Sequence, residues 1–172
     1  MTIRPSLLTD LPALMPIFDE ARRTIAALGI DQWQDGYPNQ EVIAADIDRG
    51  ESYAVEIDGD ICGTFVMLTG GEPTYDKIHD GAWLTGDSSD GYVAIHRVAI
   101  SVARRGSGIS SEIIAHAADF AKKNGKASLR IDTHEGNVVM RRMLEKNGFV
   151  HCGTIYLESG AARVAYEKSV KI

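Results

Sequence analysis

The sequence has few of the features that mark several protein classes. Only two of its 172 residues are cysteines, Cys62 and Cys152, and neither has the near neighbours that a zinc site needs. We expect both thiols to be reduced and buried. No segment approaches the roughly 18 apolar residues of a membrane helix, and the first residues lack the apolar run of a secretory signal. The sequence therefore predicts a cytoplasmic protein with no metal and no membrane partner.

The sequence also has fewer basic than acidic residues. Lys and Arg total 18 against 24 Asp and Glu, so the formal net charge is −6. This balance opposes binding to nucleic-acid phosphates over most of the surface. Hydrophobic residues make up 44% of the chain and charged residues 24%, which is typical of a globular protein. The length favours a single domain over residues 1–172.

Two helices are expected before the main strands. Apolar residues recur every three or four positions over residues 11–28, which predicts a helix that Pro16 kinks and Gly29 ends. Asn39 can cap a second helix that ends at Gly50. A further strand over residues 1–6 is left open.

Strands and a long loop follow. The Asp58-Gly59 pair, flanked by β-branched residues, predicts a tight hairpin between strands at 53–57 and 60–68. Residues 70–91 are rich in Gly, Asp and Ser, which predicts a long loop. A loop of this length in a compact domain usually has a function.

The second half alternates strands and helices. This pattern predicts an α/β (α+β) fold with the order ααβββαβαββ. The expected elements are a strand at 92–100, a helix from 107 to 124, a strand at 127–133, a helix at 137–147, a strand at 149–157 and a short strand around 164–166.

A glycine-containing turn joins the strand at 92–100 to the helix after it. Such a turn exposes the unpaired N–H groups of the first helical turn, and the positive end of the helix favours an anion there. Arg104 and Arg105 add positive charge. Phosphate is the expected ligand. The segment reads Arg104-Arg105-Gly106-Ser107-Gly108-Ile109-Ser110-Ser111.

Two nucleotide-binding loops match this segment poorly. A Walker A loop needs a lysine after its second glycine, and none follows Gly108 within reach. A dinucleotide fingerprint needs a third glycine and a place after the first strand of a parallel unit, whereas this turn lacks that glycine and lies past the middle of the chain.

The run from Arg105 to Ser110 resembles the Gln/Arg-x-x-Gly-x-Gly/Ala signature of the GNAT N-acetyltransferases. A second motif agrees with the first. Residues 137–149, Asn-Val-Val-Met-Arg-Arg-Met-Leu-Glu-Lys-Asn-Gly-Phe, are similar to the family's Asn followed by a helix that ends in Glu-Lys-x-Gly-Phe. The likeness is good over roughly residues 92–157.

The resemblance implies a GNAT fold, in which a mixed sheet of six to seven strands is flanked by about four helices and a splayed central strand pair holds acetyl-CoA. It implies that the glycine loop binds the pyrophosphate, that the strand before it hydrogen-bonds the pantetheine arm, and that an asparagine also lines the site. The implied acetyl-CoA-binding residues are Val98, Ala99, Ile100, Arg104, Arg105, Gly106, Ser107, Gly108, Ile109, Ser110, Ser111 and Asn137.

Two residues depart from the family pattern. Ser110 stands where the signature has Gly or Ala, and its small hydroxymethyl group is compatible with phosphate binding. Leu144 stands where many relatives carry a tyrosine that protonates the departing CoA thiolate, and leucine cannot donate a proton. The changes at these positions also fit an alternative function, an acyl-CoA-binding sensor that has lost catalysis. A purely structural domain is a further alternative.

Acetyl transfer to an amine requires the amine to lose a proton, since the pKa of an alkyl amine is about 10.4. His96 and Asp132 are the candidate bases. Alternation along a strand places His96 on one face with Val98 and Ile100, although His96 could instead be a core residue. Asp132 could instead brace the turn that follows it.

The leaving thiolate has a pKa of about 8.5, so water or Tyr156 could protonate it. Tyr156 could equally be an ordinary strand residue. Cys152 is expected to pack in the core rather than to act as a nucleophile. The predicted reaction is therefore direct transfer in a ternary complex, with a small-molecule or peptide amine as acceptor. The sequence leaves the oligomeric state open, a homodimer included.

Loop aromatics are the candidate acceptor-binding residues. They are Trp33, Tyr37, Tyr75 and Trp83, and the acidic residues Glu72, Asp76, Asp80, Asp87 and Asp90 would favour a cationic amine near them. The alternative is that these aromatics hold their own loops on the core and that the acidic loop is simply solvated.

Overall fold

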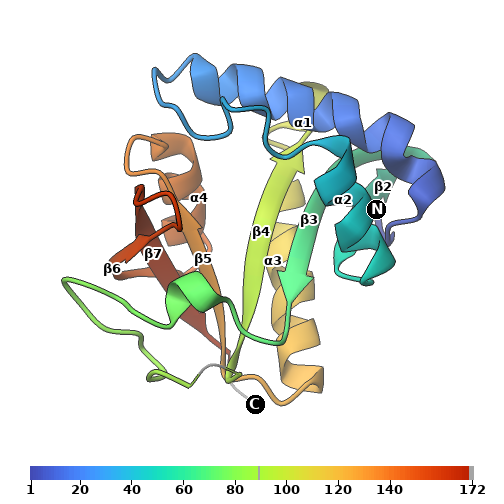
Figure 1. Cartoon of the computed structure of the whole chain (residues 1–172). Helices are drawn as coiled ribbons and strands as arrows, with labels where there is room; N and C mark the ends of the chain where they lie inside the picture. The colour runs from blue at the N-terminus through green and yellow to red at the C-terminus, as the bar shows by residue number, and fades with distance from the viewer. Residues whose placement is uncertain (89, 171–172) are drawn as a thin grey trace. The chain divides into compact units, whose positions relative to one another are not determined.

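The computed structural model describes residues 1–88 and 90–170, so the predicted loop over 70–91 contains one position, 89, outside the described residues. Within the described ranges the chain forms seven strands of a mixed sheet and four α-helices (Figure 1), which confirms the predicted fold class. The strand order is β1-β2-β3-β4-β5-β7-β6. The elements are β1 (Thr2–Pro5), α1 (Leu11–Ala26), α2 (Gln40–Asp48), β2 (Ser52–Ile57), β3 (Asp60–Leu68), β4 (Tyr92–Ile100), α3 (Ile109–Lys123), β5 (Ser128–Thr133), α4 (Val138–Lys146), β6 (Val150–Tyr156) and β7 (Ala162–Ser169), with short 3-10 helices η1 (Leu8–Asp10), η2 (Pro73–Tyr75) and η3 (Val102–Arg104).

The local signals that predicted element ends are confirmed. The Asn39 side chain accepts a hydrogen bond from the N–H of Val42 at 2.9 Å and so caps α2. Asp58 and Gly59 have φ values of 55° and 87°, the left-handed pair of a tight turn between β2 and β3. The strand left open at the N-terminus is β1, which pairs antiparallel with β2.

The described chain divides into two compact units, each built from two stretches of sequence. The first unit combines Met1–Met67 with Arg97–Ile113, and the second combines Leu68–His96 with Ile114–Ile172. β4 and α3 contribute to both. The single domain expected over residues 1–172 stays a prediction.

The first unit is built on helices α1 and α2 (blue and teal in Figure 1). Their apolar stripes supply most of one core cluster, as the three- and four-residue spacing predicted. Ala99 of β4 joins that cluster, which ties the end of β4 to α1. The cluster comprises Leu14, Ile17, Phe18, Ala21, Ile43, Ile47 and Ala99.

The second unit is built on β5, β7 and β6, which pair antiparallel in that order. β4 pairs with β5 in parallel within this unit, over residues 92–94 and 128–130. Both strands continue beyond this ladder, β4 to Ile100 and β5 to Thr133. The splayed central pair that the resemblance implies stays a prediction, because the end of β4 and the whole of β5 belong to different units.

Candidate active site

The loop that opens α3 offers a row of unpaired backbone donors. Gly106 and Gly108 have φ values of 78° and 86°, a conformation that glycine adopts without strain. The carbonyl of Gly108 accepts from Ser111 and Glu112 at 3.0 and 3.2 Å. Within the described residues no acceptor takes the N–H groups of positions 106–110. These donors lie at the positive end of a 15-residue helix, so the donor set suits a pyrophosphate.

The start of this loop is tethered to α1 in the first unit. The N–H of Val102 donates to Glu20 Oε2 at 2.7 Å, and Arg105 Nη2 donates to Thr24 Oγ1 at 2.9 Å. The Ser107 hydroxyl donates to the Arg104 carbonyl at 2.6 Å. The loop backbone is therefore held in shape before any ligand binds.

The other predicted loop residues differ in what they can offer. Ile109 is 2% exposed, so it can contribute only its backbone. Ser110 is half-buried and Ser111 is exposed, which leaves both hydroxyls accessible. Val98 and Ile100 are half-buried, whereas Ala99 is buried against α1 and α2.

Arg97 interrupts the regular strand that the sequence predicts over residues 92–100. Its φ is 53°, a left-handed conformation in the middle of β4. Side chains alternate only along a regular strand, so this residue interrupts the alternation that had placed His96 on one face with Val98 and Ile100. The premise of a regular strand therefore fails at this residue, and the shared face of the three side chains stays a prediction. Such a break has no reliable signal in the sequence, since arginine rarely adopts a positive φ.

The side chain of Arg97 is held inside the first unit. Its Nη1 lies 3.3 Å from Oδ2 of Asp46, which is fully buried in α2. Its guanidinium also lies over the Tyr37 ring, 5.4 Å from the centroid. The Asp46 carboxylate and the Tyr37 ring thus both hold the Arg97 side chain, and with it the interruption of β4.

His96 has a carboxylate partner that the sequence did not reveal. Its Nε2 lies 3.1 Å from Oε2 of Glu72, which lies just before η2. Burial would raise the pKa of Glu72, but the contact with His96 and the bonds from Thr74 outweigh it and lower the pKa to about 2. Glu72 is therefore a carboxylate at neutral pH. In the sequence, Glu72 is only one of several acidic residues of the loop.

Asp132 is hydrogen-bonded to a buried tyrosine. Tyr75 Oη donates to Asp132 Oδ1 at 2.7 Å, and Tyr75 is only 1% exposed. Burial, together with the charge of Asp132, raises the pKa of this phenol well above its ordinary value, so it stays protonated. The Tyr75 ring also lies beside His96, with centroids 5.8 Å apart. The structure thus brings both candidate bases together around Tyr75 in the second unit.

The long loop after β3 is packed firmly on the second unit. Trp83 is 5% exposed, its indole N–H donates to the Tyr75 carbonyl at 3.0 Å, and the Arg130 guanidinium lies 4.2 Å from its ring centroid. A Cβ at Gly81 would lie 1.9 Å from the Cys152 carbonyl oxygen, so only glycine fits there. For Tyr75 and Trp83 this packing matches the alternative in which loop aromatics hold their own loop on the core.

Trp33 and Tyr37 lie in the first unit and are more accessible. Their rings contact each other edge-on at 6.5 Å, and Trp33 packs against Phe18 at 6.1 Å. Trp33 also lines an open pocket of about 340 Å³ together with Asp19, Arg22, Arg23, Ala26, Gln34 and Gly36.

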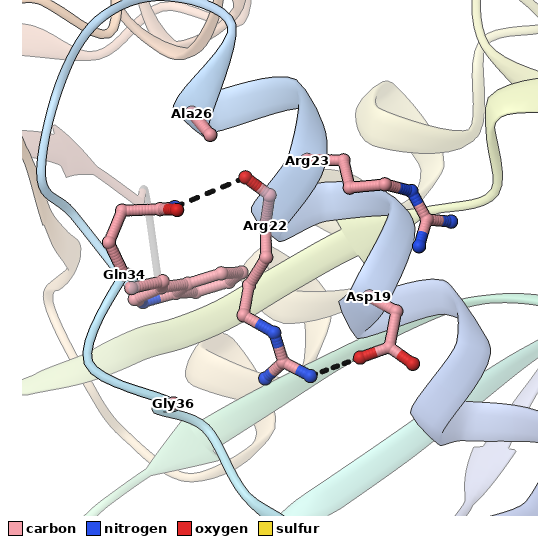
Figure 2. A pocket seen from close by; sticks show the side chains of 7 residues that line it. Asp19, Arg22, Arg23, Ala26, Gln34 and Gly36 are labelled. Carbon is pink, nitrogen blue, oxygen red and sulfur yellow. Dashed lines mark hydrogen bonds and ion pairs between the residues drawn. The ribbon is translucent and has the colours of Figure 1, made fainter.

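Polar side chains order one side of that pocket. Figure 2 shows the Arg22 guanidinium directed at Asp19 and the Gln34 amide directed at the Arg22 carbonyl, to which it donates at 3.1 Å. Arg23 points away from Gln34 in the same view.

The comparisons with known proteins agree with this arrangement. The sequence matches the family described as "Acetyltransferase (GNAT) family" over residues 12–149, which is most of the chain. The chain belongs to the GNAT acetyltransferase family. A comparison with functionally curated proteins found no match.

Solved structures of GNAT acetyltransferases share the fold. A GNAT acetyltransferase from Streptococcus agalactiae is 35% identical, with a TM-score of 0.89 over 99% of this chain and 96% of the other. One from Listeria monocytogenes is 20% identical, with a TM-score of 0.72 over 98% and 94% of the two chains. A Salmonella typhimurium protein whose structure contains its cofactor acetyl-CoA is 18% identical, with a TM-score of 0.69 over 99% and 94%.

The second GNAT motif forms α4 and its cap. The Asn137 side chain accepts from the N–H of Met140 at 3.2 Å and so starts the helix. Leu144 is fully buried. Tyr156, at the end of β6, is 47% exposed and meets the His79 ring edge-on at 5.1 Å.

The remaining predictions concern cysteines, metals and membranes. Cys62 and Cys152 are unpaired and buried, as predicted. Across residues 1–88 and 90–170 no cluster of three or more His, Cys, Asp or Glu is arranged to hold a metal ion. None of the helices in that part of the GNAT chain is long and apolar enough to cross a bilayer.

Proposed function

We propose that this protein transfers an acetyl group from acetyl-CoA to a primary amine by direct attack in a ternary complex. The observation that carries the proposal is the row of unpaired N–H groups at residues 106–110, at the start of α3 and shortly after the end of β4. In this proposal the row binds the pyrophosphate, with Arg104 and Arg105 adding positive charge. The backbone of Val98 and Ile100 binds the pantetheine arm, and Asn137 lines the same site.

Acetyl-CoA supplies the acetyl group and a thiol leaving group. A bond forms between the amine nitrogen and the acetyl carbon, and the bond from that carbon to sulfur breaks. The amine proton passes to a base on this chain, His96 or Asp132, and the thiolate takes a proton from water or from Tyr156. Leu144 cannot take part because it is apolar and buried.

The acceptor amine is proposed to bind beside Trp33 and Tyr37. The pocket next to Trp33 has room for a small organic group, and the Tyr37 ring remains 36% exposed. Tyr75 and Trp83 contribute through the packing of their loop, because both are almost completely buried.

Two measurements on the wild-type protein test this function. Acetyl-CoA at about 100 times its Kd should stabilise the fold by about 2.7 kcal/mol and raise Tm by several degrees. A panel of amino acids, peptides and polyamines should then include an amine that accelerates release of CoA. Protection without any accelerated release would favour the sensor alternative, and no protection at all would favour a purely structural domain.

Gly108→Ala should weaken acetyl-CoA binding roughly tenfold or more, equivalent to about 1.4 kcal/mol. Alanine is disfavoured at the φ of 86° by about 1–2 kcal/mol, so the turn would shift and move the N–H groups away from their positions. Isothermal titration calorimetry measures the change in Kd.

Gly59→Ala is the matched control for this prediction. Gly59 has a φ of 87° in the β2–β3 turn, so alanine there should lower the free energy of unfolding by a similar amount while leaving acetyl-CoA affinity unchanged. Equal losses of affinity in the two variants would contradict a specific role for the turn at Gly108.

A further inference from the structure

We infer that Glu72 is the positioning residue of this site, and that it holds His96 so that Nδ1 of the imidazole accepts the proton of the amine. His96 is then the general base, and Asp132 is a structural acceptor that anchors Tyr75. This inference rests on the proposed acetyl transfer and decides between its two candidate bases.

Glu72 is fixed at both its backbone and its side chain. Its N–H donates to Tyr92 Oη at 2.9 Å, and its Oε1 accepts from the N–H and the hydroxyl of Thr74 at 3.2 and 2.9 Å. These bonds leave Oε2 facing His96 Nε2. The carboxylate side chain is only 18% exposed, so it acts on the imidazole with little screening by solvent.

An ionised carboxylate beside Nε2 selects one tautomer of the neutral imidazole. The 3.1 Å contact between Nε2 and Oε2 is an ion-pair contact rather than a well-aligned hydrogen bond. Because the ionised Glu72 carries no hydrogen, the contact is favourable only when Nε2 carries one, and Nδ1 then keeps its lone pair. No described residue bonds Nδ1, and the His96 side chain retains 19% exposure. The Tyr75 ring beside the imidazole restricts its rotation. Nδ1 is therefore the nitrogen that an incoming amine can meet.

Asp132 has a different part in the same cluster. Its Oδ1 receives the hydrogen bond of Tyr75, a phenol that stays protonated and is almost fully buried. This bond engages one of the two carboxylate oxygens of Asp132 with a fixed partner. The same bond holds the Tyr75 ring against His96, so Asp132 acts on His96 through Tyr75.

Glu72→Gln is the variant that tests the positioning role. Glutamine keeps the size of the side chain but loses its charge, so kcat should fall roughly 10- to 100-fold, within the usual reach of general-base catalysis, and Kd for acetyl-CoA should stay unchanged.

Two variants provide controls. Glu72→Asp keeps the charge and should restore part of the lost kcat. Glu158→Gln removes a charge from an exposed residue that no step of the proposed reaction uses, and it should leave kcat at the wild-type value. A kcat that stays unchanged in Glu72→Gln, or that falls equally in Glu158→Gln, would overturn the positioning role.

Nitrogen NMR of the imidazole tests the tautomer without any turnover. In ¹⁵N-labelled wild-type protein, the His96 ring in its neutral form should carry its proton on Nε2, with the signals assigned by their loss in His96→Gln. Glu72→Gln should weaken this preference. A neutral ring protonated on Nδ1 would overturn the inference even in an active enzyme. Absence of acetyl transfer to every amine would instead count against the proposed function, and the NMR result would still stand alone.

Discussion

His96→Gln is expected to lower kcat roughly 10²- to 10⁴-fold, the usual contribution of a general base. Glutamine fills similar space, but it cannot accept a proton from an amine. The acetyl-CoA Kd should change little, because the proposed pyrophosphate donors lie in the backbone of residues 106–110. Steady-state kinetics with an active amine, together with calorimetric titration of acetyl-CoA, separates the two effects.

Asp132→Asn and His151→Gln complete that experiment. The amide oxygen introduced by Asp132→Asn would still accept the Tyr75 hydroxyl bond, so a structural role for Asp132 predicts a small loss of kcat. His151 is exposed on β6, and its replacement should have no effect on turnover. If His96→Gln remained fully active while Asp132→Asn lost its activity, Asp132 would be the base.

Arg130→Met should lower the free energy of unfolding by about 3–5 kcal/mol, because it leaves a buried carboxylate without its cation. Arg130 is 2% exposed, and its Nε donates to Glu167, which is fully buried, at 3.0 Å. Its guanidinium also lies between the rings of Trp83 and Tyr92, 4.2 and 4.1 Å from their centroids. Urea denaturation measures the loss. Arg142→Met, on an exposed part of α4, should stay within about 0.5 kcal/mol of the wild type.

The charge of Glu167 gives this prediction a pH dependence. Burial alone would raise the pKa of Glu167, but the Ser128 and Thr85 hydroxyls and the Arg130 guanidinium together lower it below its ordinary value. A lowered folded-state pKa stabilises the protein above the unfolded pKa, and this stabilisation is lost as pH falls through the folded value. Arg130→Met combined with Glu167→Gln should therefore lose less than the sum of the single variants and depend less on acid pH. Strict additivity would contradict the pairing.

The parts of the fold that depend on neighbouring residues could be predicted from the sequence. The Asp58-Gly59 turn and the Asn39 cap depend on neighbouring residues only, and both formed where the sequence predicted. β7 was predicted too short, since it runs from Ala162 to Ser169. The charged residues of β7 do not look like those of a buried strand in the sequence. Glu167 can be buried because Arg130, 37 positions away, neutralises its charge.

The candidate site was predictable only in part for the same reason. The glycine loop carries its chemistry in consecutive residues, so its sequence indicated an anion site. Glu72 and His96 are 24 positions apart, and Tyr75 and Asp132 are 57 apart, so only the folded chain shows which carboxylate meets which partner. The break at Arg97 likewise depends on Asp46 and Tyr37, which hold its side chain.

Acetyl transfer from isotope-labelled acetyl-CoA tests the central claim most directly. The wild-type protein is incubated with a panel of primary amines and with acetyl-CoA that carries ¹³C in its acetyl group. Mass spectrometry then identifies the labelled products. We predict one labelled acetyl group on an accepted amine for each CoA released, with the rate reduced in Gly108→Ala at limiting acetyl-CoA and in His96→Gln at saturation. Binding of acetyl-CoA without label on any amine would contradict the account.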